Sequence, residues 1–221
     1  MLGNKGLKTF IVFEKLDTQI GQLELFRKDK TVQINKIQDL NLDYIDEYEI
    51  LKEYEREILS ETLTEYGDTE YEYKIVNKVA RVAVWEFNNT PYIIVFSRGI
   101  SNLMVKNLIE ESFGYKLKRL DFNKVFFNEI IELNDSKVVQ TTFKSLNIDQ
   151  EFSIEGLINE SSNFTSENVI TELEVILHSL NIKFRVSRLG RVALYGEPDI
   201  KTIAIFVERL VNILTYIRKG D

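Results

Sequence analysis

The chain has 221 residues, of which 44% are hydrophobic and 29% charged, and it contains no Cys, one His and two Pro. This apolar content is ordinary for a globular protein, so a core can form without disulfides. The lack of Cys excludes disulfide frameworks, thiolate zinc sites, iron–sulfur clusters and thiol nucleophiles. Residues 10 to 13 form an apolar run too short for a signal-peptide core, and no segment approaches the roughly 20 apolar residues that span a bilayer. We therefore expect a soluble, cytoplasmic protein that does not contact a membrane.

In the first part of the chain, alternating apolar and polar residues over 23 to 27 and 31 to 37 predict a β-hairpin. Residues 10 to 13 lack polar alternation, which predicts a strand buried on both faces.

The next segment is strongly acidic. Residues 43 to 73 hold 12 acids and 2 bases, in a chain whose formal net charge is −7. Apolar residues recur there at three- and four-residue steps, which predicts a helix over residues 43 to 66 with Asp43 as its N-cap. Acidic residues at a four-residue step would line one side of that helix: Glu49, Glu53, Glu57, Glu61 and Glu65. The interpretations are a solvated helix face, a docking surface for a basic protein partner and a bound cation. The cation is the least favoured of the three, because the carboxylates do not converge, and no metal site is assigned.

Strands are predicted over residues 75 to 87 and 92 to 97, joined by a turn at 88 to 91, and over 115 to 122. A helix between the second and third of these begins after Ser101 and ends at Gly114. Its predicted buried stripe is Leu103, Met104, Leu108 and Phe113. Residues 123 to 157 leave two alternatives open, a short helix over 125 to 133 or more strand.

The last 60 residues predict a helix from Thr165 or Ser166 through Leu180, a hairpin of residues 182 to 187 and 191 to 195, and a helix from Asp199 to Arg218. The apolar arc of the final helix is wider than one core-facing stripe needs. This width predicts either a central position in the fold or a subunit interface.

Residues 81 to 113 and 182 to 214 share the order strand, turn, strand, helix. We therefore expect an α+β fold of antiparallel sheet segments packed by helices, with two similar strand–strand–helix lobes. The predicted boundary separates an N-terminal domain, residues 1 to 146, from a C-terminal lobe, residues 147 to 221, and a single domain is the alternative.

Most catalytic signatures are missing from the chain, and no cofactor is expected. His178 is the only imidazole, and it is predicted on the exposed side of a helix. Glu72 with Lys74, and Asp199 with Lys201, resemble fragments of the PD-(D/E)xK nuclease pattern, but Asp199 is better explained as a helix N-cap. Catalysis is therefore the least favoured class of function.

The C-terminal hairpin is rich in cations. The two-residue period of a strand directs Lys183 and Arg185 to one face, while Arg188 and Arg191 flank the turn and Tyr195 follows on the second strand. Guanidinium groups suit phosphate and an aromatic ring can stack on a base, although arginines that protect a sheet edge would give the same pattern. A third alternative is docking on an acidic protein surface, which includes the acidic helix predicted over residues 44 to 66 of this chain.

The leading hypothesis is a non-catalytic nucleic-acid-associated subunit that contacts the phosphate backbone through this hairpin. The alternative is a protein-interaction or inhibitory module that binds a basic partner through Glu49, Glu53, Glu57 and Glu61 and self-associates into a homo-oligomer through its C-terminal helix.

Overall fold

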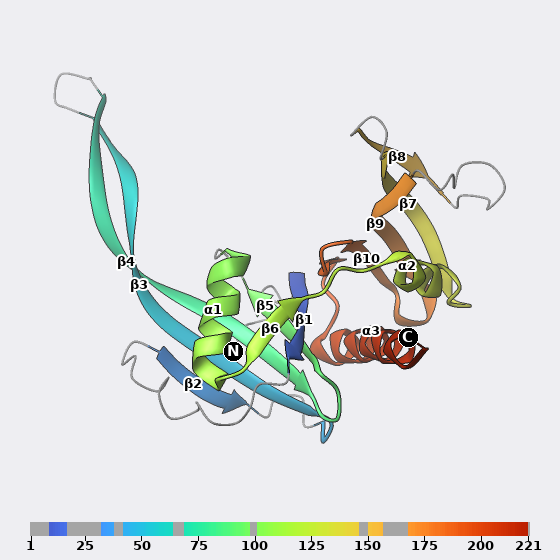
Figure 1. Cartoon of the computed structure of the whole chain (residues 1–221). Coiled ribbons are helices and arrows are strands. Elements are labelled where there is room, and N and C mark those ends of the chain that lie inside the picture. The colour runs from blue at the N-terminus through green and yellow to red at the C-terminus, as the bar shows by residue number, and fades with distance from the viewer. Residues whose placement is uncertain are drawn as a thin grey trace.

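The computed structural model describes residues 9–16, 32–37, 42–63, 69–97, 101–145, 150–156 and 168–220. Within these ranges the chain forms one antiparallel sheet and three α-helices, a mixed α and β fold in which sheet predominates (Figure 1). The strand order is β2-β3-β4-β5-β1-β11-β10-β9-β7-β8, and β6 also pairs with β1. No helix among these residues is long and apolar enough to cross a membrane.

The strands are β1 (Thr9–Leu16), β2 (Val32–Ile37), β3 (Ile45–Leu63), β4 (Thr69–Phe87), β5 (Tyr92–Ser97), β6 (Lys116–Arg119), β7 (Ser136–Ser145), β8 (Glu151–Glu155), β9 (Asn168–Leu177), β10 (Ile182–Ser187) and β11 (Arg191–Tyr195). The helices are α1 (Asn102–Phe113), α2 (Lys124–Ile131) and α3 (Ile200–Gly220), with a short 3₁₀ helix at His178–Leu180. The first arm of the predicted hairpin at residues 23 to 37 lies outside the described residues. In the segment left open between residues 123 and 157, α2 is the short helix.

Strand β1 lies at the centre of the sheet, between β5 and β11. Phe10 and Val12 belong to the core cluster that α2 and α3 cover, whereas Ile11 and Phe13 belong to the cluster that α1 covers. The two longest helices therefore pack on opposite faces of the sheet. This double burial confirms the prediction from the unbroken apolar run.

Helix α1 has the predicted ends. The Ser101 hydroxyl accepts a hydrogen bond from the Met104 backbone N–H at 3.2 Å, and Gly114 adopts a left-handed φ of 75°. The predicted buried stripe was partly wrong, because Val105, Leu108 and Ile109 are buried whereas Leu103 is 68% exposed. Relative to the predicted orientation, the helix is rotated about its axis, so that the side carrying Val105, Leu108 and Ile109 packs on the sheet.

The predicted acidic helix over residues 43 to 66 is wrong. Residues 45 to 63 form β3, which pairs with β4 along the full 19 residues of each strand. Cross-strand pairing with the β-branched and aromatic residues of β4 overrides the helix propensity of the glutamates. Side chains four residues apart share a face in a strand as they nearly do in a helix, so Glu49, Glu53, Glu57 and Glu61 remain on one face. Glu65 lies outside the described residues.

The predicted helix over residues 165 to 180 is also wrong, because residues 168 to 177 form β9. Leu173, Val175 and Leu177 face the core, while Glu172 and Glu174 alternate with them on the other face. Apolar residues in this stretch satisfy the spacing of either element, and its many β-branched residues favour the strand.

Helix α3 begins after Asp199 as predicted. The Asp199 carboxylate accepts hydrogen bonds from the backbone N–H groups of Lys201 and Thr202, both at 3.0 Å. Its wide apolar arc is buried in the core of the same chain and comprises Ile203, Ala204, Phe206, Val207, Leu210, Val211 and Leu214. The central position therefore accounts for the arc without a subunit interface, and self-association stays a prediction.

Both halves of the sheet contain a hairpin followed by a helix, β4–β5–α1 and β10–β11–α3. The hairpins flank β1 on its two sides, since β5 and β11 are its neighbours. β7 and β9, which precede and follow the predicted boundary at residue 147, pair with each other. The division into two domains stays a prediction.

Candidate functional site

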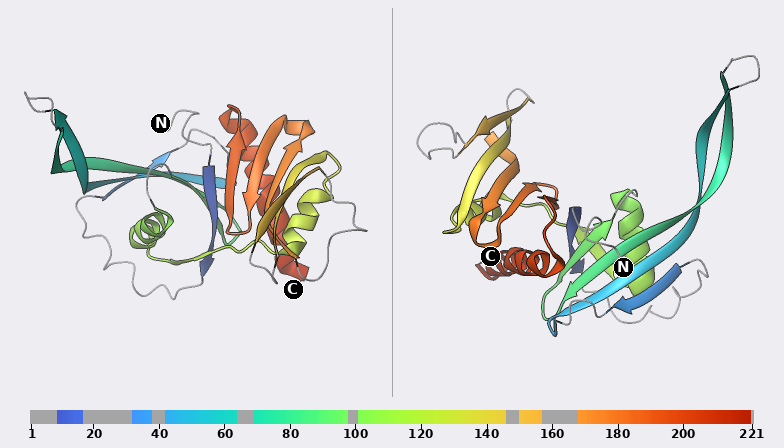
Figure 2. Two further views of the ribbon diagram at one scale, coloured as in Figure 1. Left: turned by 90° about the horizontal axis from the view of Figure 1, so that it is seen from above. Right: turned by 180° about the vertical axis from the view of Figure 1, so that it is seen from behind.

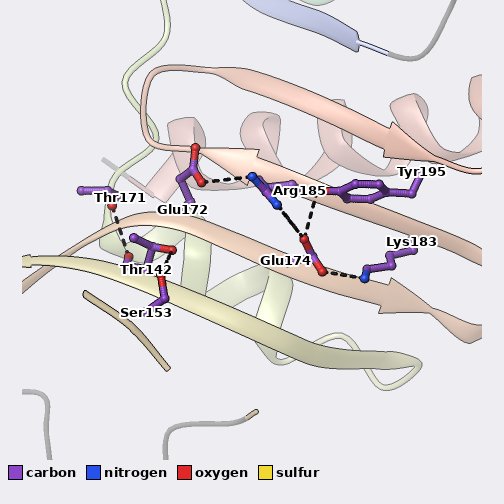
Figure 3. A network of polar contacts seen from close by, with 8 residues as sticks. All are labelled: Thr142, Ser153, Thr171, Glu172, Glu174, Lys183, Arg185 and Tyr195. Carbon is purple, nitrogen blue, oxygen red and sulfur yellow. Dashed lines mark hydrogen bonds and ion pairs between the residues drawn. The ribbon is translucent and has the colours of Figure 1, made fainter. Parts of the chain in front are cut away.

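The C-terminal hairpin forms as predicted, with Val186 opposite Val192 and a turn at residues 188 to 190. Phe184 and Val186 are buried on the face of the sheet that α3 covers. Lys183, Arg185 and Tyr195 lie on the opposite face. Figure 3 shows these three side chains around a single carboxylate, that of Glu174 on the adjacent strand β9. The basic residues are therefore brought together, but around an acid.

Glu174 is 7% exposed and pairs with each of its three neighbours. Lys183 Nζ lies 2.6 Å from one carboxylate oxygen, and Arg185 Nη2 and the Tyr195 hydroxyl donate to the other at 3.1 and 3.0 Å. Glu172 lies 3.7 Å from Arg185 Nη1 and adds a second carboxylate to that guanidinium. Two of the four predicted phosphate-binding cations are thus already neutralised.

The pKa of Glu174 reflects this environment. Burial alone would raise it, but hydrogen bonds from Lys183, Arg185 and Tyr195 outweigh the burial and hold the pKa below its ordinary value. The same bond to Glu174 raises the pKa of Arg185. Burial and the hydrogen bond to Glu174 raise the pKa of Tyr195. Glu174 is therefore held ionised, and Arg185 and Tyr195 are held protonated, at neutral pH.

The turn of the hairpin packs on the body of the protein. Arg188 pairs with Asp121 through two hydrogen bonds of 3.0 and 3.2 Å, and its backbone oxygen accepts from the Phe122 N–H at 2.7 Å. Arg119 donates to the Leu189 backbone oxygen at 2.6 Å. A Cβ atom at Gly190 would lie 2.7 Å from the backbone oxygen of Leu120. The turn is thus a packed junction.

Arg191 is exposed, and no carboxylate among the described residues pairs with it. The other three predicted cations are paired, and their acids come from β9 and from residue 121. Nucleic-acid contact by this hairpin stays a prediction, with Arg191 as the one of its four cations that the described part of the chain leaves unpaired.

A shallow polar pocket of about 190 Å³ opens beside this network. Its lining residues come from β7, β8, β9 and β10 and are Gln140, Thr142, Ser153, Glu172, Glu174 and Arg185. The Thr142 and Ser153 hydroxyls are 3.0 Å apart and hydrogen-bonded to each other. Because its charged and hydroxyl groups already pair with one another, the pocket gives no evidence of a ligand.

The second candidate surface is the hairpin of β3 and β4. β2 pairs with β3 only as far as Lys52, and β5 pairs with β4 only from Val82 onward. Beyond these points the two strands continue as a twisted two-stranded ribbon, which extends away from the other elements in every view (Figures 1 and 2). We call this part, Glu53 to Leu63 and Thr69 to Arg81, the ribbon.

One face of the ribbon combines acids and apolar residues. Directly opposed residues of an antiparallel pair share a face, and so do residues two apart along a strand. The pairs on this face are Glu53 with Val79, Glu55 with Asn77, Glu57 with Ile75, Leu59 with Tyr73 and Glu61 with Tyr71. We call it the acidic–apolar face, because its acids lie mainly along β3 and its apolar residues along β4. The acidic lane is the row Glu53, Glu55, Glu57 and Glu61 on β3, and the apolar lane is the row Tyr71, Tyr73, Ile75 and Val79 on β4.

The apolar residues of this face are open to solvent. Tyr71, Tyr73, Ile75 and Val79 are 60% to 70% exposed, and Leu59 is 53% exposed. Glu53, Glu55, Glu57 and Glu61 are also exposed, and no cation of the described chain pairs with any of them. An exposed apolar stripe beside unpaired acids is typical of an interaction surface.

The opposite face of the ribbon is basic. Its pairs are Tyr54 with Lys78, Arg56 with Val76, Ile58 with Lys74 and Ser60 with Glu72. The apolar side chains here are at most half-exposed, since long aliphatic stems of lysine and arginine can cover them. We call it the basic face.

Glu49 belongs to the predicted acidic set but lies at the base of the ribbon. It is 8% exposed, and its carboxylate lies 3.3 Å from Arg81 Nε. Glu53, Glu57 and Glu61 are exposed beyond it on the same face. The predicted acidic surface is therefore split between one buried, paired residue and three exposed ones.

Sequence reasoning missed Glu55 and the apolar lane of Tyr71, Tyr73, Ile75 and Val79. The signal was available, because apolar residues at 71, 73 and 75 alternate with charged ones at 70, 72 and 74. The predicted strand began only at residue 75, and the helix assigned to residues 43 to 66 left this alternation without a partner strand.

The catalytic candidates do not converge. His178 is exposed in the 3₁₀ helix, and Asp199 is occupied as the N-cap of α3. In the described ranges there is no group of three His, Asp or Glu side chains that could hold a metal ion.

No protein-family model matches the chain, and no curated protein matches it in sequence.

Proposed function

We propose that this protein is a non-catalytic interaction module that docks a basic, partly apolar segment of another protein on the acidic–apolar face of its ribbon. The observation that carries the proposal is the exposed apolar lane of β4 next to the unpaired acidic lane of β3. A partner that brings cations to β3 and apolar side chains to β4 would satisfy both lanes.

Charge placement within the ribbon supports an external partner. Opposite charges placed directly across two strands stabilise a sheet by about 0.2 to 1 kcal/mol per pair. None of Glu53, Glu55, Glu57 and Glu61 lies opposite a cation, although five cations occupy the same two strands. The ribbon forgoes these internal pairs, so its acids remain available for a partner's cations.

Comparison of the two halves of the sheet also supports the proposal. We infer that the halves are similar lobes around β1, each with a hairpin followed by a helix. In the C-terminal half, β10 pairs with β9 over its 6 residues, whereas β3 and β4 pair over 19. The extra length of the ribbon is not needed to complete a sheet of this kind.

A second copy of the chain is a poor occupant of this face when the two acidic–apolar faces meet. In a two-fold face-to-face contact the acidic lane would lie over either the acidic lane or the apolar lane of the other copy. The first arrangement repels, and the second buries carboxylates without cations. A basic partner avoids both costs.

The experiment measures binding of a fluorescent 12-residue peptide of alternating Arg and Val to the full chain by anisotropy. Glu53→Gln, Glu55→Gln and Glu57→Gln together are expected to weaken binding about tenfold, from roughly 0.5 kcal/mol per lost pair. The matched control replaces three exposed glutamates elsewhere, Glu132, Glu151 and Glu155, with Gln. Equal weakening by both triple variants would refute the proposal, because the peptide would then sense only net charge.

A further inference from the structure

The basic face of the ribbon has a regular arrangement of its own. Its cations alternate between the strands on successive pairs: Lys78 on β4, Arg56 on β3 and Lys74 on β4. Each lies opposite an apolar or aromatic residue, which is Tyr54, Val76 and Ile58 in the same order. The result is a zigzag of three cations along one side of a projecting element.

These three cations are accessible. Arg56 and Lys78 are exposed, and no carboxylate in the described part of the chain pairs with either. Lys74 lies 3.4 Å from Glu72, but both side chains are about half or more exposed, and such a surface pair contributes little and can exchange for another anion. Lys52, nearer the body, lies 3.7 Å from Glu111 of α1 and is not part of this set.

From this geometry we infer that the basic face of the ribbon binds the phosphate backbone of a nucleic-acid duplex. Same-face residues are about 6.8 Å apart along a strand, so Lys78, Arg56 and Lys74 extend over about 14 Å. That length corresponds to about four base pairs at 3.4 Å per step.

The segregation of charge makes this contact compatible with an acidic chain. Glu53, Glu55, Glu57 and Glu61 all project from the other face of the ribbon, so they point away from a duplex on the basic face. Glu72 is the acid on the basic face, and it pairs with Lys74 at the end of the set. The inference concerns a different surface from the proposed protein-docking site and does not depend on it. Together the two faces would make the ribbon an adaptor between a nucleic acid and a basic protein.

The experiment measures anisotropy of a labelled 20-base-pair DNA duplex with the full chain at 50 and 200 mM salt. Three phosphate contacts predict that wild-type affinity falls about 40-fold between these concentrations, from a slope near 0.9 per contact. The triple variant Arg56→Gln, Lys74→Gln and Lys78→Gln is expected to bind at least tenfold more weakly at 50 mM. The control Lys137→Gln, Lys201→Gln and Lys219→Gln, which changes net charge equally, is expected to stay within twofold of wild type.

Two further variants separate this site from the acidic–apolar face and from the C-terminal hairpin. Glu53→Gln, Glu55→Gln and Glu57→Gln should bind the duplex at least as tightly as wild type, because it removes negative charge without touching the basic face. Undiminished duplex binding by the basic-face variant, or loss caused only by Arg191→Gln in the C-terminal hairpin, would overturn the inference. Displacement of the duplex by an equal charge concentration of polyglutamate would also overturn it, since the surface would then accept acidic polypeptides.

Discussion

Glu57 of β3 lies directly opposite Ile75 of β4, on the same face of the ribbon, and Ile75 is 70% exposed. If this pair only stabilised the sheet, we would expect a cation opposite Glu57 or a second apolar residue opposite Ile75. Their juxtaposition joins the acidic and apolar lanes and marks the middle of the acidic–apolar face.

Because this apolar lane contributes little to the core, Ile75→Ser with Val79→Ser should leave the free energy of unfolding within about 1 kcal/mol of wild type. The same double variant should weaken binding of the Arg–Val peptide. Ile50→Ala is the matched control inside the sheet, where Ile50 is fully buried, and it should cost about 2 to 5 kcal/mol. Urea unfolding measures the stability of wild type, of the double serine variant and of Ile50→Ala. A large stability loss from the double variant would mean that the apolar lane packs against the chain itself.

The packed turn of the C-terminal hairpin can be tested with two glycines. Gly190 and Gly196 have φ values of 71° and 83°, so alanine is strained at either position. Only at Gly190 would the new Cβ collide with backbone, at 2.7 Å from the Leu120 oxygen, whereas Gly196 has open space. Thermal unfolding should show Gly196→Ala about 1 kcal/mol less stable than wild type and Gly190→Ala at least twice as destabilised. Equal losses would mean that the turn does not rest on residues 120 to 122.

Stability should depend on pH through Glu174. Its pKa is lower in the folded chain than in the unfolded chain, so its contribution is present above the unfolded carboxyl value near 4.3. The contribution is lost as the pH falls through the lower, folded pKa. Wild type should therefore lose more stability than Glu174→Gln between pH 6 and pH 3 in urea unfolding. Parallel pH profiles for the two proteins would show that Lys183 and Arg185 do not hold this carboxylate.

The Asp199 carboxylate should act only as a helix cap. Asp199→Ala should destabilise the chain by about 0.5 to 2 kcal/mol, since two backbone N–H groups lose their acceptor. Asp199→Asn keeps an acceptor oxygen and should stay close to wild type. If Asn destabilised as much as Ala, the carboxylate charge and not the cap geometry would be responsible.

The elements that were predicted correctly are those whose signals lie in adjacent residues of the chain. The buried strand at residues 10 to 13 followed from an unbroken apolar run, and the ends of α1 followed from Ser101 and Gly114. The segments at residues 45 to 63 and 168 to 177 were assigned as helices because their apolar spacing fits both periods. Their identity depends on strands β4 and β10, which local spacing does not reveal.

In the candidate sites, too, local spacing predicted some features, while others depend on which strands pair. The acidic residues were predicted to line one side of a helix. They share a face of the ribbon instead, because a four-residue step is also a multiple of the strand period. The neutralisation of the basic hairpin was missed because its acids come from elsewhere: Glu174 lies 11 residues from Arg185, and Asp121 lies 67 residues from Arg188. Those pairings arise from the order of strands in the sheet.

Reversal of the acidic lane is the most direct measurement for the proposed docking function. A variant with Glu53→Lys, Glu55→Lys and Glu57→Lys keeps the apolar lane and changes only the sign of the charge beside it. In anisotropy titrations it should bind a peptide of alternating Glu and Val and lose affinity for the Arg–Val peptide, the reverse of wild type. If the reversed ribbon still preferred the Arg–Val peptide as strongly as wild type does, the carboxylates of β3 would not be the docking surface.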